Sequence, residues 1–295
     1  MPVAKVIPVL LLAGLAAYDN SMKGSLSMAT LPVDGFTVSF DAQERAAAEL
    51  IGRACSRSSQ LIHECWGLPT PQDLHVYVAT SWLRTVFWSA PWSWRVPLGL
   101  TLPLWYSRTQ KLWQSAGGWA QTYGMRRTVM LKPPRLMAQG DSSIGDRVFI
   151  PEKDTDRKVE RVACHELVHA FTSHLRLPVW LHEGLAMVTV DTFAGKPTVK
   201  QETVTALASS QGRQSPQASG RLNLKDPDAV VYLYVRGYWI THYLEETRPG
   251  LLKSLLVQRF SHRELEGRLA SAYGMGQEEF WRTIDALVYA GRMGG

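Results

Sequence analysis

The sequence His165-Glu166-Leu167-Val168-His169 contains the residues of this chain with the clearest chemical potential. Two histidines at i and i+4 of a helix project from one face about one turn apart, so both imidazoles can reach the same metal ion. Glu166 is offset from His165 by about 100° around the helix axis. This places its carboxylate beside the ion, where it can take a proton from a bound water. We expect this pattern by chance in roughly one percent of chains of this length.

A zinc site usually takes three protein ligands, so the two histidines need a further partner. The next predicted helix offers Trp180-Leu181-His182-Glu183-Gly184-Leu185-Ala186. H-E-x-x-H followed by W-L-x-E-G-L-A resembles the gluzincin zinc metallopeptidases, in particular the thermolysin-like group with the peptidase MA arrangement. The resemblance implies that one Zn²⁺ ion is held by His165, His169 and Glu183. His182 is the competing ligand, and it could equally support a ligand or lie at the surface.

Other features of the motif region limit the resemblance. Leu175 stands six residues beyond the second histidine, where the metzincin pattern requires a further histidine. Met187 stands four residues after Glu183, so no carboxylate at that position can orient a ligating histidine. The small Gly184 and Ala186 would let their helix approach the motif helix closely.

The resemblance implies a metallopeptidase that hydrolyses peptide or protein substrates. Glu166 would remove a proton from the zinc-activated water and return it to the leaving amine. In such enzymes a Tyr or His commonly stabilises the oxyanion, and similarity to a Y-x-x-S/G pattern points to Tyr234. Tyr238 and His242 share a helix face with Tyr234 and are alternatives for this role. All three could instead be ordinary packing residues.

The elements that hold these residues predict an α+β fold. A small mixed sheet with the active-site helix would come first, and a mostly helical C-terminal part would follow. Strands are predicted at 36–40, 74–79, 128–131 and 147–150. Helices are predicted at 42–66, with Asp41 as N-cap and a stop at Gly67, and at 156–175, 180–190, 229–246, 250–260, 263–273 and 277–290.

Three segments lack a motif that assigns them a role. The predicted strand 128–131 precedes the motif helix, and we expect it to be an edge strand that could pair with an extended substrate. Residues 82–119 contain seven tryptophans. They form either a flap at a membrane interface or substrate site, or an irregular packed lobe. The stretch 196–228 reads as a partly helical connector.

Composition places the chain among folded globular proteins. Of its 295 residues, 45% are apolar and 20% charged. The net charge of +6 comes from scattered Lys and Arg residues, which argues against a nucleic-acid partner but permits peripheral membrane association. The apolar run 6–17 predicts a signal peptide or an N-terminal anchor, hence an exported, periplasmic or outward-facing anchored protein. A buried N-terminal strand or helix is the alternative for this run.

The predicted organisation is a signal or anchor at 1–22, an α/β subdomain at 23–178 and a helical subdomain at 179–295. Cys55 and Cys65 lie on one predicted helix about 15 Å apart, too far for a disulfide, and Cys164 is expected to be a packing residue. The competing functional hypothesis is a non-catalytic zinc-binding or membrane-surface scaffold protein with a peptidase-like fold. An intact Glu166 argues against it, because a structural zinc ion needs no general base.

Overall fold

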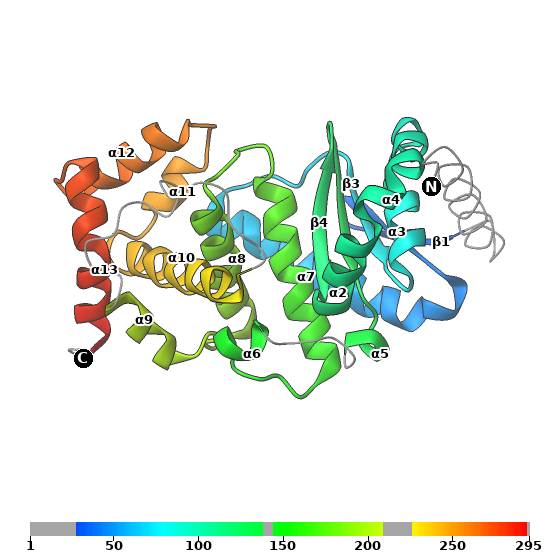
Figure 1. Ribbon diagram of the computed structural model, residues 1–295, viewed down its shortest axis with the longest axis horizontal. Helices are drawn as coiled ribbons and strands as arrows, with labels where there is room; N and C mark the ends of the chain where they lie inside the picture. The colour runs from blue at the N-terminus through cyan, green and yellow to red at the C-terminus, as the bar shows by residue number, and fades with distance from the viewer. Residues whose placement is uncertain (1–27, 138–143, 209–225, 294–295) are drawn as a thin grey trace, which may run out of the picture. The chain divides into compact units, whose positions relative to one another are not determined.

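A computed structural model describes residues 28–137, 144–208 and 226–293 of the chain (Figure 1). The fold is α+β, as predicted. The described residues form two compact units: 28–56, 71–137 and 154–163 make up the first, and 57–70, 144–153, 164–208 and 226–293 the second. The motif residues 165–169 and Glu183 therefore belong to the same unit. The predicted N-terminal signal or anchor lies outside the described residues, as does part of the connector.

The first unit is built on a five-stranded mixed sheet in the order β1-β2-β3-β5-β4. Strands β2, β3 and β5 are mutually parallel, and β1 and β4 add to them antiparallel. Val38, Val76 and Val129 face one another across the three central strands and are fully buried, which fixes the register. The strands are β1 Ala29–Val33, β2 Phe36–Phe40, β3 Leu74–Val78, β4 Gly118–Tyr123 and β5 Arg126–Leu131.

Three predicted strands are confirmed, and the fourth is wrong. Residues 147–150 form the end of helix α6, Gly145–Val148, and a single bridge from Phe149 to Val199. Strands β1 and β4 were not predicted, because Pro32 interrupts the first pattern and the second lies in the tryptophan-rich segment. β4 pairs with β5 along its length, so 128–131 is not an edge strand. The proposed pairing of a substrate with that strand is therefore also wrong.

The helices of the first unit include α3, α4 and the N-terminal half of α2, up to Ser56. The predicted helix 42–66 appears as a short 3-10 turn Ala42–Glu44 followed by α2 Arg45–Trp66. Asp41 occupies the N-cap position without a capping hydrogen bond; its carboxylate accepts one from Thr80 Oγ1 at 2.7 Å. The tryptophan-rich segment is regular and not an irregular lobe: it forms α3 Trp82–Ser89, α4 Trp92–Ser115 and β4. Pro97 and Pro103 inside α4 obscured this helix at the sequence level.

The second unit is helical and contains the predicted helices with shifted ends. The motif helix α7, Thr155–Thr172, stops three residues before the predicted Leu175, and its C-terminal part, which includes the motif, belongs to this unit. The helix of Glu183, α8, spans Val179–Ala194 and ends at Gly195 with φ of 65°, a conformation that favours glycine. The remaining helices are α9 Thr205–Ala208, α10 Pro227–Thr247, α11 Leu251–Leu255, α12 His262–Ala272 and α13 Gln277–Met293.

Helices α8 and α10 meet through two glycines. A Cβ atom on Gly184 would lie 2.1 Å from Thr241 Oγ1 and 2.4 Å from the Gly237 carbonyl oxygen. One on Gly237 would lie 2.3 Å from the Trp180 carbonyl oxygen. Gly184 thus permits close approach to α10, not to the motif helix as its sequence position suggested. This contact places the backbone that carries Glu183 directly against the helix that carries Tyr234.

The three cysteines are free thiols, as predicted for the helix-borne pair, and Cys55 and Cys164 are fully buried. None of the helices in the described ranges combines the length and the apolar character needed to cross a bilayer.

Candidate metal centre

The last two turns of α7 bring the motif histidines together. Leu167, Val168 and Phe171 are fully buried and anchor this part of the helix in the core. On the adjoining face, the Nε2 atoms of His165 and His169 stand 3.0 Å apart, with their rings nearly perpendicular. The i, i+4 spacing therefore directs both imidazoles at one point, as the sequence predicted.

Helix α8 supplies the third group of this cluster. Glu183 Oε2 lies 3.3 Å from His165 Nε2 and 3.5 Å from His169 Nε2. Tetrahedral zinc with bonds near 2.0–2.2 Å separates neighbouring ligand atoms by about 3.3–3.6 Å. Two edges of the observed triangle, 3.3 and 3.5 Å, fall in that range, and the third, 3.0 Å between the two imidazole nitrogens, is slightly shorter. These three residues can bind a metal ion, and they form the one group of three or more possible ligands within the described ranges.

The cluster also fits a cation chemically. Glu183 Oε2 is buried and makes no hydrogen bond to a described residue, although it faces two imidazole nitrogens. Such an orphaned oxygen is costly in the absence of a positive partner. The side chains of His165, His169 and Glu183 keep exposed fractions of 18%, 12% and 13%, so solvent reaches the group. Three ligands with solvent access are typical of a catalytic site and leave one coordination position open.

The titration of the cluster favours positive charge at its centre. Burial would raise the pKa of Glu183, but His169 and then His165 hold it well below the ordinary range. Burial would lower the pKa of His169, but the negative charge of the adjacent Glu183 carboxylate, with a contribution from Glu166, raises it. The carboxylate is therefore ionised, and a cation bound between the three groups would replace the proton that the histidine otherwise carries.

His182 lies next to the cluster and outside it. Its Nε2 is 3.2 Å from His169 Nδ1, and the two rings are 4.1 Å apart. Burial, together with the neighbouring His169, lowers the pKa of His182 to about 3, so its ring is neutral and can accept a hydrogen bond. If His169 binds a metal ion through Nε2, its Nδ1 carries the proton and donates a hydrogen bond to His182 Nε2. The sequence left His182 open as a competing ligand, as support for a ligand or as a surface residue; its ring lies against His169 and outside the group of His165, His169 and Glu183.

Glu166 and Tyr234 complete the surroundings of the three ligands. Glu166 is buried on α7 directly after His165, and its charge helps to raise the pKa of both His169 and Tyr234. The charge of Glu183 chiefly raises the pKa of Tyr234 well above its ordinary value; burial, Glu166 and hydrogen bonding to Glu183 add to this. Tyr234 therefore keeps its proton and remains a hydrogen-bond donor beside the cluster.

The other two residues of the predicted polar stripe have partners elsewhere. Tyr238 donates to Asp191 Oδ2 at 2.7 Å, and burial and that carboxylate raise its pKa. His242 Nδ1 lies 2.6 Å from Arg292 and 3.4 Å from Glu246 Oε1. Of the three candidates for oxyanion stabilisation, Tyr234 is the one beside Glu183. Asp191, which also accepts bonds from Thr198, was not recognised in the sequence because no motif marks it.

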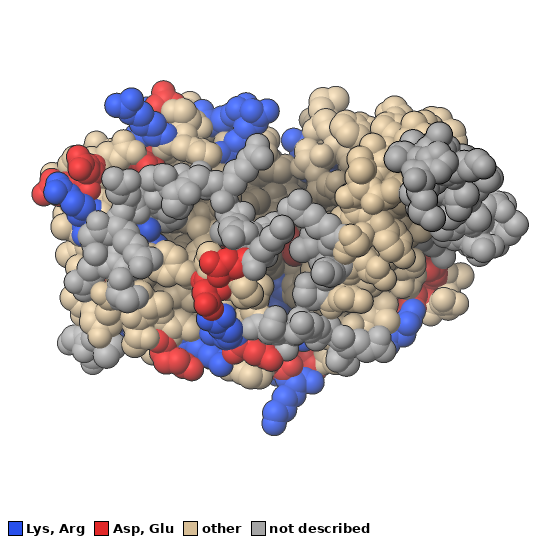
Figure 2. Space-filling view, in the orientation of Figure 1, with Lys and Arg blue, Asp and Glu red and all other residues tan. Residues whose placement is uncertain are grey.

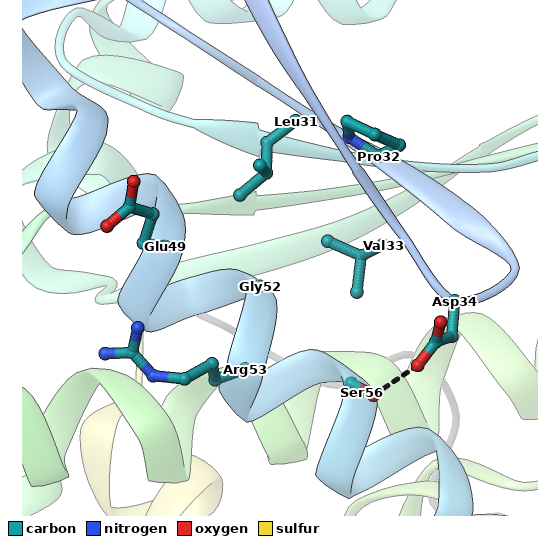
Figure 3. A pocket seen from close by; sticks show the side chains of 8 residues that line it. All are labelled: Leu31, Pro32, Val33, Asp34, Glu49, Gly52, Arg53 and Ser56. Carbon is teal, nitrogen blue, oxygen red and sulfur yellow. Dashed lines mark hydrogen bonds between the residues drawn. The ribbon is translucent and has the colours of Figure 1, made fainter.

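A groove in the first unit contains none of these groups. Figure 3 shows it between strand β1 and helix α2, where Gly52 lets the Val33 side chain approach and Ser56 Oγ donates to Asp34 at 3.3 Å. Its lining combines apolar strand residues with Glu49 and Arg53 and offers no set of metal ligands.

Comparison with known proteins adds no family assignment: no protein-family model matches the chain, and no curated protein matches it significantly.

Proposed function

We propose that this chain is a zinc-dependent metallopeptidase of the gluzincin type with a thermolysin-like arrangement. One observation carries the proposal: His165 Nε2, His169 Nε2 and Glu183 Oε2 converge with near-tetrahedral spacing. The buried Glu166 directly follows the first of these ligands in the chain. A structural zinc ion is normally closed off by four protein ligands and needs no general base. Three ligands with an adjacent carboxylate and a protonated tyrosine favour hydrolysis.

In the proposed mechanism, three residues around the zinc ion have separate roles. Zinc would supply an acidified water molecule and a Lewis acid for the scissile carbonyl. Glu166 takes the proton from the attacking nucleophile and passes it to the leaving amine, as a general base and then a general acid. Tyr234 donates from its hydroxyl to the oxygen on which negative charge develops, an effect often worth a few kcal/mol. His182 holds the ring of His169 in the orientation that binding requires.

The proposal is tested with Glu166→Gln in the full chain. We expect this variant to retain zinc by metal analysis, because Glu166 is not a ligand, and to lose hydrolysis of a quenched-fluorescence peptide library by about 10²-fold or more. A chelator should abolish cleavage by the unmodified protein, and zinc should restore it.

Glu160→Gln is the matched control, since Glu160 lies on the same helix outside the candidate site and its replacement should leave cleavage unchanged. Full turnover in a zinc-loaded Glu166→Gln variant would remove this residue from the mechanism. Absence of metal from the purified protein after zinc reconstitution would remove the proposal itself.

A further inference from the structure

Helix α4 packs against α3 with one side only. Leu102 on this side is buried, and the rings of Trp105 and Tyr106 contact the ring of Trp82 at centroid distances of 5.8 and 5.1 Å. Arg95 also turns toward α3, because its guanidinium donates to the carbonyl oxygens of Ala90 and Trp88. Leu102, Trp105 and Arg95 on this side of α4 are therefore used in folding.

The opposite side of α4 is apolar and exposed. Trp92, Val96, Leu100 and Leu104 follow one another at four-residue steps, and their exposed fractions are 72%, 61%, 63% and 85%. We call these four residues the α4 apolar face. The described surface over α3 and α4 is uncharged in Figure 2. Water-exposed rows of large apolar side chains are uncommon in soluble proteins and mark interaction surfaces.

The β4–β5 hairpin extends this surface. Trp94 is 51% exposed, and its ring lies 5.8 Å from that of Tyr123 at the end of β4. The turn that follows presents Met125, which is 83% exposed, and leads directly into Arg126 and Arg127. An exposed thioether followed by two cations thus adjoins the N-terminal end of α4.

The charge of this part of the chain has one sign. Residues 74–140 contain no Asp or Glu and eight basic residues, namely Arg84, Arg95, Arg108, Lys111, Arg126, Arg127, Lys132 and Arg135. The segment that carries the apolar face is therefore positively charged by its own sequence; the carboxylates that contact it come from outside it, Glu44 pairing with Arg135 and Asp41 accepting a hydrogen bond from Thr80. A negatively charged surface is the complement of such a segment.

We propose that the α4 apolar face lies on the surface of an anionic lipid membrane. The apolar part of α4 is the sixteen residues from Trp92 to Ser107, before Arg108 and Lys111. As a helix it extends over about 24 Å, which is too short to span a bilayer but suited to lie along its interface. α4 is apolar on both sides, and α3 covers only one, so the second side needs an apolar cover. Tryptophan at the helix start favours the headgroup region, and the basic residues favour anionic headgroups. This inference does not depend on the proposed hydrolysis.

Vesicle flotation of the full chain tests the inference. The protein should float with phosphatidylcholine vesicles that contain phosphatidylglycerol, bind pure phosphatidylcholine more weakly, and dissociate partly at high salt. The double substitution Leu100→Gln with Leu104→Gln should weaken binding by about tenfold or more, because two leucine side chains no longer enter the interface. Circular dichroism verifies that the variant is folded.

Val257→Gln serves as the matched control, because Val257 is 78% exposed in the turn after α11, away from α4 in the chain. It should bind like the unmodified protein. Equal binding of the α4 variant and the unmodified protein overturns the inference, as does failure of the unmodified protein to bind anionic vesicles. Sedimentation that instead reveals a dimer abolished by the α4 substitutions also overturns it, in favour of a second copy of the chain.

Discussion

At the scale of single residues, we expect different roles for His169 and His182, whose rings lie side by side. His169 offers Nε2 to the shared centre and Nδ1 to His182, so one ring connects the ligand cluster with a neutral neighbour. The i, i+4 spacing and the resemblance together predicted His165, His169 and Glu183. The sequence left the position of His182 open between a ligand, a support for one and a surface residue, because its contact with His169 depends on how α8 is rotated relative to the end of α7.

Substitution of Glu183 should lower zinc affinity more than substitution of His182. Glu183→Ala removes a direct ligand and should cost more affinity than His182→Ala, for which we expect a loss of about 10–100-fold, typical of a partner that orients a ligand. Competition with a chromogenic chelator measures both values. His182→Asn, which can still accept a hydrogen bond, should recover part of the loss. A larger loss for His182→Ala than for Glu183→Ala would make His182 the ligand.

Removal of the hydroxyl group should lower kcat at Tyr234 and not at Tyr238. Tyr234→Phe is expected to lower kcat by about 10²-fold at unchanged zinc content, because the donor to the developing oxyanion is lost. Tyr238→Phe removes a bond to Asp191 and should leave kcat near that of the unmodified protein. Steady-state kinetics of both variants measure the difference. Equal effects of the two substitutions would contradict the role given to Tyr234.

At the scale of elements, the helix ends and the sheet were only partly predictable. Alternation and turn residues predicted β2, β3 and β5, and apolar periodicity predicted the helices of the second unit. α4 was missed because Pro97 and Pro103 normally argue against a helix interior, and β1 because Pro32 argues against a strand. The sequence suggested that Gly184 faces the motif helix, but it faces α10. The sequence gives the size of a residue but not the helix against which it packs.

That contact makes Gly184 sensitive to the smallest substitution. Gly184→Ala should lower the free energy of unfolding by about 1–3 kcal/mol, since the added methyl meets Thr241 and the Gly237 backbone. Zinc affinity should fall with it, because Glu183 precedes this glycine. Gly267→Ala is the control: a Cβ there meets nothing within 4 Å, and the change inside α12 should raise stability slightly. Urea denaturation compares the two; a neutral Gly184→Ala would show that the helices separate easily.

At the scale of the whole molecule, the α+β class was predicted from the sequence, and the zinc peptidase assignment remains a proposal. The group of His165, His169 and Glu183 could be predicted because the two histidines follow local helical spacing and the resemblance implied Glu183. The order of the sheet could not, because pairing of β5 with both β3 and β4 involves strands whose patterns are distant or interrupted. Arg236 and Asp285 show the same limit: the pair joins α10 and α13 at 2.9 Å in a fully buried position that no local pattern predicts.

Global stability should depend on this buried ion pair. Asp285→Ala leaves a buried guanidinium without its carboxylate and should destabilise the protein by about 3–5 kcal/mol. Glu49→Ala breaks the exposed pair with Arg45 and should change stability by no more than about 0.5 kcal/mol. Thermal and urea unfolding measure both. Similar small effects for the two substitutions would mean that the buried pair contributes little beyond a hydrophobic replacement.

The paired glycines of α8 and α10 also constrain how this protein can evolve. Neither position can acquire a side chain unless the opposite backbone retreats, so mutations at the two sites are not independent of each other. A lineage that tolerated a larger residue at one of them would have to reposition Glu183 as well. We therefore expect descendants that preserve the ion-binding geometry to preserve both glycines, which makes the pair a useful marker when distant relatives are sought.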